Sequence, residues 1–161
     1  MAQFAPRIAA GQGSRATGFS DAARIVENAR HLNYERLARS QAYSKRPAYE
    51  SLWDCWQSCR RPNWDGYSAF AVEQDTYRQA YQLIEALPIG CPLPSAGAEP
   101  DGHLTLEWHR NPRWTLSVSV SPEGTLYYSA LLGKEDPRGS CPFYGELPES
   151  LLFLIRRVHG Q

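Results

Sequence analysis

The spacing of apolar residues changes once along this 161-residue chain, and the change limits the possible folds more than any other feature. Before residue 88 apolar side chains recur every three or four residues, which is typical of amphipathic helices. After residue 101 they alternate with polar ones, which is typical of strands with one buried face. Between the two regions lies PIGCPLPSAGAEPD (88–101), with four of the chain's twelve prolines, which we expect to be an extended, semi-rigid connector.

Three helices are predicted before this connector. The first covers about 20–39, after an N-cap at Ser20-Asp21, and Pro47 is expected to break the helical region because proline cannot donate to the helix ladder. The second covers about 48–61 and the third about 73–87. Their apolar stripes are Ala22-Ile25-Val26-Ala29-Leu32, Tyr49-Leu52-Trp53-Trp56 and Tyr77-Ala80-Tyr81-Ile84-Leu87.

Three strands are predicted after the connector: HLTLEWH (103–109), RWTLSVSVS (113–121) and TLYYSALL (125–132). Short turns join them, so we expect an antiparallel meander with one apolar and one polar face. The segment GKEDPRGSCPFYG (133–145) is predicted to be a loop that ends in a short edge strand. A helix over PESLLFLIRRV (148–158) closes the chain.

An apolar sheet face and several apolar helix stripes are buried together most simply when the helices lie on one side of the sheet. We therefore predict an α+β fold, a three- to four-stranded antiparallel meander packed on one face by three to four helices. The predicted organisation is a flexible tail (1–19), a basic amphipathic helix arm (20–47) and the α+β domain (48–161). A chain of this length can bury a core without disulfides or metals.

The net charge is zero but unevenly distributed. Residues 1–47 carry eight Lys or Arg against three Asp or Glu, net +5, whereas residues 48–161 carry nine against fourteen, net −5. A basic arm on an acidic body indicates a surface for a partner. The candidate contacts on the predicted first helix are Arg24, Arg30, Arg36 and Arg39.

The N-terminal stretch MAQFAPRIAAGQGSRATG lacks a basic start followed by an apolar block, and Leu151–Ile155 is too short to span a bilayer. We expect a cytoplasmic protein with no membrane partner and with reduced thiols at Cys55, Cys59, Cys91 and Cys141. Paired C-x2-C knuckles and glycine-rich phosphate loops are absent, so no metal and no cofactor is predicted. A Cys/His nucleophilic pair stays open, because such partners meet in space and not in sequence.

The stretch PNWDGYSAF (62–70) places two aromatics around an Asp-Gly turn. Gly66 can adopt positive φ, and Asn63 can end the preceding helix in a left-handed conformation, with Trp64 and Tyr67 buried on either side. We interpret Asn63, Trp64, Asp65, Gly66 and Tyr67 as a structural turn. The alternative, Asp65 as a catalytic carboxylate, lacks a neighbouring His, Lys or second acid in the sequence.

The polar face of the predicted sheet is the second candidate surface. His103, Glu107 and His109 share it with hydroxyls of the next strand, Thr115, Ser117 and Ser119. An antiparallel sheet open to solvent has such a face without any function, yet a partner could dock there. We therefore add His103, Glu107 and His109 to the candidate contacts.

Five segments together resemble a widespread family of uncharacterised bacterial proteins: NWDGYSA (63–69), ALP (86–88), DGHLTLEW (101–108), LSVSVSPEGTLYYSAL (116–131) and LPESLL (147–152). The resemblance covers about residues 50–158 and implies a single domain. It implies no activity and no functional residues. Ser68 stands where the family usually has Gly, a departure that bears on the tightness of the turn.

We predict a non-catalytic protein that binds a macromolecule, most simply another protein, as a regulator or inhibitor of the antitoxin or anti-defence kind carried on a mobile element. The first alternative is a small hydrolase or transferase that uses Asp65 or Glu107 with a histidine. The second is a nucleic-acid-binding accessory protein, suggested by the arginines of the arm. The sequence does not predict an oligomeric state.

Overall fold

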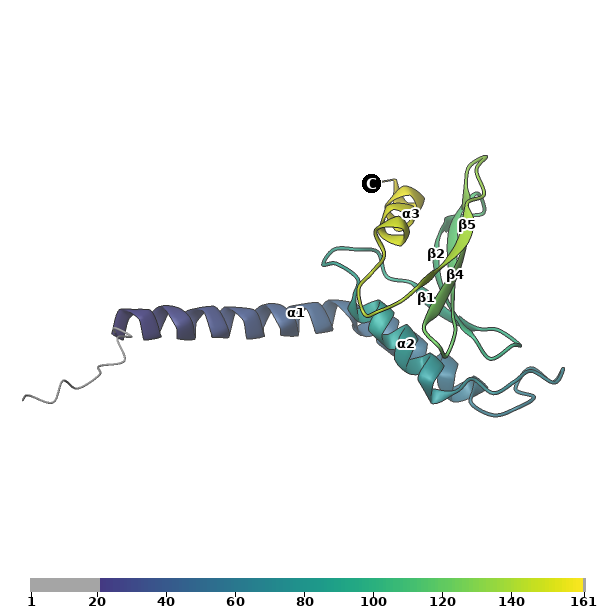
Figure 1. Ribbon diagram of the computed structural model, residues 1–161, viewed down its shortest axis with the longest axis horizontal. Coiled ribbons are helices and arrows are strands. Elements are labelled where there is room, and N and C mark those ends of the chain that lie inside the picture. Colours follow the sequence, from purple (N-terminus) through teal and green to yellow (C-terminus); the bar gives the residue numbers. More distant parts are fainter. Residues whose placement is uncertain (1–20, 161) are drawn as a thin grey trace, which may run out of the picture. The chain divides into compact units, whose positions relative to one another are not determined.

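The computed structural model describes the backbone of residues 21–160 and the side chains of residues 24–36 and 44–160. The predicted tail (1–19) and the side chain of Arg39 lie outside the described part. Three helices and five strands are described, α1 (Asp21–Cys59), α2 (Gln74–Glu85), β1 (Ser95–Ala98), β2 (Leu104–Asn111), β3 (Trp114–Val120), β4 (Thr125–Leu132), β5 (Arg138–Pro142) and α3 (Glu149–His159). The fold is α+β, as predicted (Figure 1).

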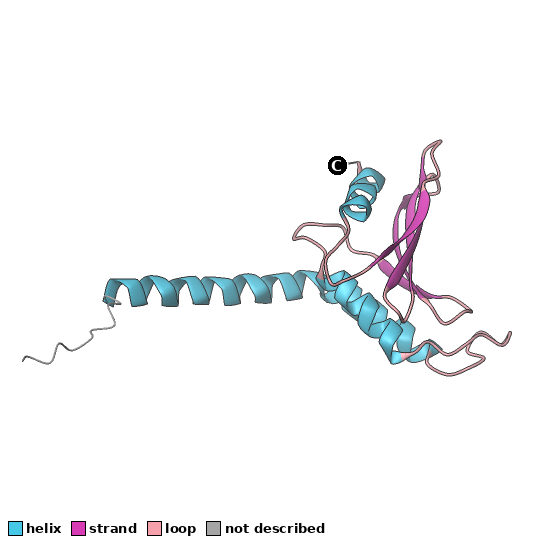
Figure 2. Cartoon of the chain, viewed as in Figure 1, coloured by secondary structure: helices cyan, strands magenta, loops and turns pink. Residues whose placement is uncertain are grey.

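The strands form one antiparallel sheet in the order β1-β2-β3-β4-β5, each strand pairing with its neighbour in the sequence. Leu106 lies opposite Val118 in β3, and Leu116 lies opposite Ala130 in β4. These paired apolar residues occupy the inner face of the sheet, and the intervening Thr105, Ser117 and Ser119 occupy the outer face. Figure 2 shows α2, α3 and the last part of α1 on one side of the sheet.

The sheet has one strand more than the upper limit predicted. β1 pairs with β2 inside the segment expected to be an extended connector, and β5 forms the expected edge strand beside β4. The sequence of β1, SAGA, is short and made of small residues, and although Ala96 and Ala98 lie beside the core, it gives too weak an alternation to predict a strand.

The core lies between the inner face of the sheet and the helices. Its fully buried residues come from every layer, including Leu52 of α1, Ile84 of α2, Trp108 of β2 and Ile155 of α3. The Trp108 indole N–H donates to the carbonyl oxygen of Pro92 at 2.8 Å, which fixes the connector against the sheet. Trp53, predicted to be buried, is instead 47% exposed.

The predicted helix end before Pro47 is wrong, because α1 continues through this proline to Cys59. Pro47 is exposed, so the carbonyl oxygen that loses its helical donor can bond to water. Ala48 and Leu52, which follow it, are buried in the core. We attribute the continuity to this burial, which offsets the cost of the proline.

The chain divides into two compact units, Met1–Ala38 and Arg39–Gln161. The second unit therefore begins upstream of Ala48, where we predicted the domain to start. The last part of the predicted arm belongs to this unit, and it contains a buried residue, Lys45, which is 6% exposed. No described helix is both long and apolar enough to cross a membrane.

Lys45 joins α1 to the C-terminal end of α2. Its Nζ donates to the carbonyl oxygens of Glu85 at 2.7 Å and Leu87 at 2.6 Å. Carbonyl oxygens at a helix C-terminus lack helical donors and attract a positive charge. Burial lowers the pKa of Lys45, and the nearby Glu85 opposes this shift. A lysine read as part of a basic arm is thus a structural residue of the second unit.

We predict that Lys45→Met lowers the free energy of unfolding by about 2–4 kcal/mol, because methionine fills the space of the stem but leaves two carbonyl groups without a donor. Urea unfolding followed by circular dichroism measures the change. Arg46→Met is the matched control. Arg46 is exposed and pairs with Glu50 on the helix surface, so its loss should cost no more than about 0.5 kcal/mol. Equal effects of the two substitutions would contradict the role assigned to Lys45.

Candidate functional site

The stretch 62–70 forms a tight loop held by its own side chains. The Asp65 carboxylate accepts hydrogen bonds from the backbone N–H groups of Tyr67 at 2.7 Å and Ala69 at 3.1 Å. The Asn63 side chain accepts one from the N–H of Ser68 at 2.9 Å. The Trp64 indole donates to the carbonyl oxygen of Phe70 at 3.0 Å. One oxygen of the Asp65 carboxylate, Oδ1, therefore accepts both of the bonds from Tyr67 and Ala69 and holds the loop.

The backbone of this loop has the predicted left-handed positions and one more. Asn63 has φ 60° and Gly66 has φ 77°, as expected, and Ser68 also adopts positive φ, 73°. The turn thus forms with serine at the position where the resembling family usually has glycine. The prediction that Tyr67 is buried is wrong, because its side chain is 90% exposed. Trp64 is half-buried.

The turn between β1 and β2 packs directly against the end of this loop. The Phe70 N–H donates to the carbonyl oxygen of Pro100 at 2.8 Å. Gly102 has φ +91°, and a Cβ there would lie 3.2 Å from the carbonyl oxygen of Ala71. Only glycine allows both the conformation and this close approach. Two of the segments that carry the family resemblance, NWDGYSA and DGHLTLEW, therefore adjoin each other in the fold.

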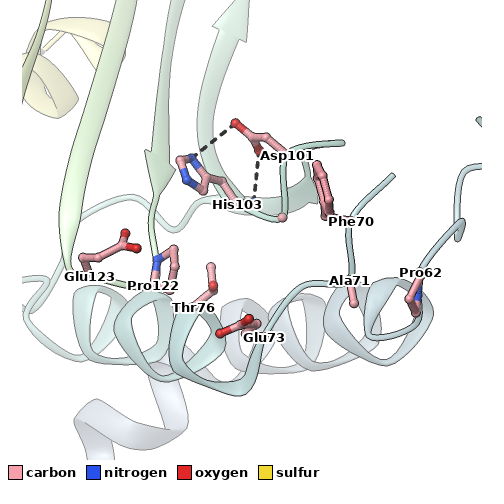
Figure 3. Close-up of a pocket in the computed structure, with 10 residues that line it drawn as sticks. Pro62, Phe70, Ala71, Glu73, Thr76, Asp101, His103, Pro122 and Glu123 are labelled. Carbon is pink, nitrogen blue, oxygen red and sulfur yellow. Dashed lines mark hydrogen bonds and ion pairs between the residues drawn. The ribbon is translucent and has the colours of Figure 1, made fainter. Parts of the chain in front are cut away.

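A hollow of about 540 Å³ opens beside this contact, and we call it the acidic hollow. Its walls come from the β1–β2 turn, the β3–β4 turn, the segment before α2 and the first turn of α2. The side chains that give it its chemistry are Glu73, Asp101, Glu123, His103, Thr76 and Phe70. Figure 3 shows them around one space, with Glu73 just before α2 and Thr76 on its first turn, on the side opposite His103 and Asp101.

Three of these six side chains are carboxylates, and no Lys or Arg lines the hollow among the described residues. Hydrogen bonds from its own backbone N–H and from the Ser121 hydroxyl hold the pKa of Glu123 below its usual range, and the charge of His103 adds to the effect. Glu73 precedes α2 at the N-cap, but its side chain makes no capping hydrogen bond. The hollow is therefore a region of negative potential.

His103 links the acidic hollow to the outer face of the sheet. Its Nδ1 lies 3.5 Å from Oδ2 of Asp101 and 3.1 Å from Oγ of Ser119, and its ring stacks on Tyr127 with centroids 6.0 Å apart. Glu99 lies between β1 and His103, and its carboxylate accepts a hydrogen bond from the Thr105 hydroxyl. The donor atoms of Glu99, Asp101 and His103 lie within 4.8 Å of one another, the one such group among the described side chains. Carboxylates with an imidazole are ligands for Zn²⁺ or Mn²⁺.

The three residues predicted for the polar sheet face, His103, Glu107 and His109, do not form one cluster. Nδ1 of His109 lies 3.8 Å from Oε1 of Glu107, and each side chain is about half exposed. Both residues lie further along the chain than His103, on β2. The surrounding residues are hydroxyls such as Thr115 and Ser117, as predicted. His103 belongs to the acidic hollow, whereas Glu107 and His109 lie on open sheet surface. The structure therefore does not bring the three together.

The described arginines of the arm, Arg24, Arg30 and Arg36, are all exposed on α1. A helix turns about 100° per residue, so these three arginines point in different directions around it. Arg36 follows Leu32 by one turn and lies in line with Ala29. The exposed aliphatic residues Ile25, Val26, Ala29 and Leu32 share one side of this segment, and we call them the apolar stripe; the exposed Tyr34 lies on the other side. Ala22, predicted to belong to the stripe, has its side chain outside the described part.

The cysteines do not resemble activated nucleophiles. All four are free thiols, and Cys59 donates to the carbonyl oxygen of Cys55, 3.0 Å away. Burial raises the pKa of each thiol, that of Cys59 to about 11. The reactive thiolate is therefore scarce at neutral pH.

No protein-family model, curated protein or solved structure matched the chain. The resemblance drawn from its motifs therefore stays a prediction. Sequence reasoning missed Glu73, Thr76, Asp101 and Glu123 as members of one site. The signal that could have found two of them is an acid directly before glycine in two turns, Asp101-Gly102 and Glu123-Gly124.

We predict opposite effects of two substitutions in the 62–70 loop. Ser68→Gly should raise the free energy of unfolding by about 0.5–1 kcal/mol, because glycine adopts φ 73° without steric cost. Gly66→Ala should lower it by about 1 kcal/mol, although nothing lies within 4 Å of the added Cβ, because only the backbone conformation resists it. Thermal and urea unfolding measure both. A stabilising Gly66→Ala would contradict the loop conformation described.

Proposed function

We propose that this protein binds a second, different protein through the apolar stripe on the N-terminal part of α1. The observation that carries the proposal is the exposure of this stripe. Ile25 is 68% exposed, Val26 59% and Leu32 54%, on a helix segment that belongs to a unit of its own. Isolated helices are marginal in water, and their stability in proteins comes from covering an amphipathic face.

The charges of the segment favour a protein over a nucleic acid. Side chains 24–36 include three Arg against two Glu, net +1, and His31 pairs with Glu35 at 3.4 Å. Nucleic-acid binding depends on the neutralisation of several phosphates by clustered cations. A nearly balanced helix with a narrow apolar side is instead typical of docking into a protein groove or against another helix.

The hydrolase or transferase alternative receives less support from the geometry. Asp65 holds the loop through one carboxylate oxygen and has no titratable partner among the described residues, and Glu107 with His109 lies on open sheet surface. A general base must reach a substrate held in a defined position. The regulator or inhibitor role, its antitoxin or anti-defence character and its link to a mobile element remain parts of the proposal that rest on the sequence.

The stripe is tested by site-specific photo-crosslinking in the cells that produce the protein. A photoreactive residue at Ala29, on the stripe, should form an adduct with another protein, and the same residue at His31, on the opposite side, should not. Ile25→Asp with Leu32→Asp should abolish the adduct, because two carboxylates would be buried in the interface. His31→Asp with Tyr34→Asp adds the same charge to the other side and should preserve it.

Mass spectrometry of the adduct distinguishes the outcomes. A different protein captured only from Ala29, and only with the stripe intact, supports the proposal. Equal adducts from both positions, an adduct with nucleic acid, or an adduct with a second copy of this chain alone would overturn it.

A truncated chain tests the position of the boundary. We predict that residues 39–161 stay folded and lose partner binding, because the deletion removes the stripe and keeps Lys45. Residues 48–161 should be less stable than residues 39–161 by about 2–4 kcal/mol, because the two carbonyl groups bonded by Lys45 lose their donor. Urea unfolding and crosslinking measure the two effects. Full binding by residues 39–161 would rule out the arm as the contact.

A further inference from the structure

Thr76 is an unsatisfied polar residue at the bottom of the acidic hollow. Its side chain is fully buried on the first turn of α2, and Oγ1 has no hydrogen-bond partner among the described residues. Buried hydroxyls are nearly always bonded, so an orphan of this kind calls for an explanation. Thr76 lines the hollow, and Figure 3 shows it on the α2 side, facing the side of His103. A ligand in the hollow could supply the missing partner.

The charges around Thr76 indicate whether the ligand would be an anion or a cation. The first turn of a helix attracts anions by itself. Here the carboxylates of Glu73, Asp101 and Glu123 oppose an anion, and no Lys or Arg of the described lining compensates them. His103 is already engaged with Asp101 and Ser119. The hollow is therefore suited to a cation.

The spacing of the carboxylates favours an extended cation over a metal ion. The one described group with three converging donors is Glu99, Asp101 and His103, and neither Glu73 nor Glu123 belongs to it. The carboxylates of the hollow are thus too widely spaced to surround one ion. A volume of about 540 Å³ lies within the range of pockets for small organic ligands.

We propose that the acidic hollow binds an organic cation with a guanidinium group, either a small molecule or an Arg side chain of a polypeptide. The planar guanidinium carries five donors, which can reach several carboxylates and the Thr76 hydroxyl together. Phe70, 70% exposed, lines the hollow, and an aromatic ring there can stack on such a group. The site lies within the second unit and is independent of the apolar stripe.

The test is an NMR titration of the full chain, labelled with ¹⁵N, at low salt. Agmatine represents the small-molecule source and the peptide Gly-Gly-Arg-Gly-Gly the polypeptide source. N-acetyl-citrulline amide has nearly the shape of N-acetyl-arginine amide without the charge, and the two form the matched pair. We expect saturable shifts at the amides of Thr76, Gly102 and Gly124 with the guanidinium compounds and none with the citrulline compound. The tighter of agmatine and peptide identifies the source.

Substitutions locate the binding. Glu123→Gln and Thr76→Val should each weaken binding of N-acetyl-arginine amide about three- to tenfold, because each removes one acceptor of a charge-assisted hydrogen bond. Thr76→Ser keeps the hydroxyl and should bind normally, which separates the loss of an acceptor from a loss of folding. Glu107→Gln removes a carboxylate from the sheet outside the hollow and should change nothing.

Three results would overturn the proposal. The first is a citrulline compound that shifts the same amides as strongly as the arginine compound. The second is the absence of saturable shifts at millimolar concentrations of every guanidinium probe. The third is a Glu107→Gln variant that weakens binding as much as Glu123→Gln.

Discussion

The apolar inner face of the five-stranded sheet is the constraint on which the rest of the structure depends. Leu104, Leu106 and Trp108 on β2 face the helices together with their partners on β3, and all six are almost completely buried. A sheet of this kind is stable only when a second layer excludes water from it. The lengths and positions of α2 and α3 follow from this requirement, and so does the polar character of the opposite face. The helix layer is in turn held by Lys45, which joins α1 to the end of α2.

The sequence was most informative where side-chain periodicity is strong. α2, α3 and the three central strands lie where the apolar spacing predicted them, because burial on one face leaves a regular pattern. It was least informative where backbone pairing or the burial of neighbouring residues determines the secondary structure. β1 pairs through main-chain hydrogen bonds in a segment that contains prolines and small residues, and α1 passes Pro47 because neighbouring side chains are buried. Neither effect is visible in the spacing of residues.

The candidate sites, too, could be predicted only in part from the sequence. The conformations of Asn63 and Gly66 could be predicted, since only a few residue types adopt positive φ easily. The acidic hollow could not, because its members come from four separate segments. In an antiparallel meander the turns β1–β2 and β3–β4 lie at the same end of the sheet. The predicted strands already placed Asp101 and Glu123 at one end of the sheet, but nothing in the sequence placed Glu73 and Thr76 beside them.

The two candidate surfaces differ in what the fold demands of them. A solvent-exposed sheet face needs polar residues for solubility, so the hydroxyls around Ser117 require no function. The acidic hollow is different, because an antiparallel sheet does not require three carboxylates in one hollow with a buried Thr76 hydroxyl that has no partner among the described residues. Such an arrangement costs free energy through charge repulsion and an unmade hydrogen bond. A bound cation removes both costs at once, and for this reason the hollow and not the open sheet carries the inference of a ligand.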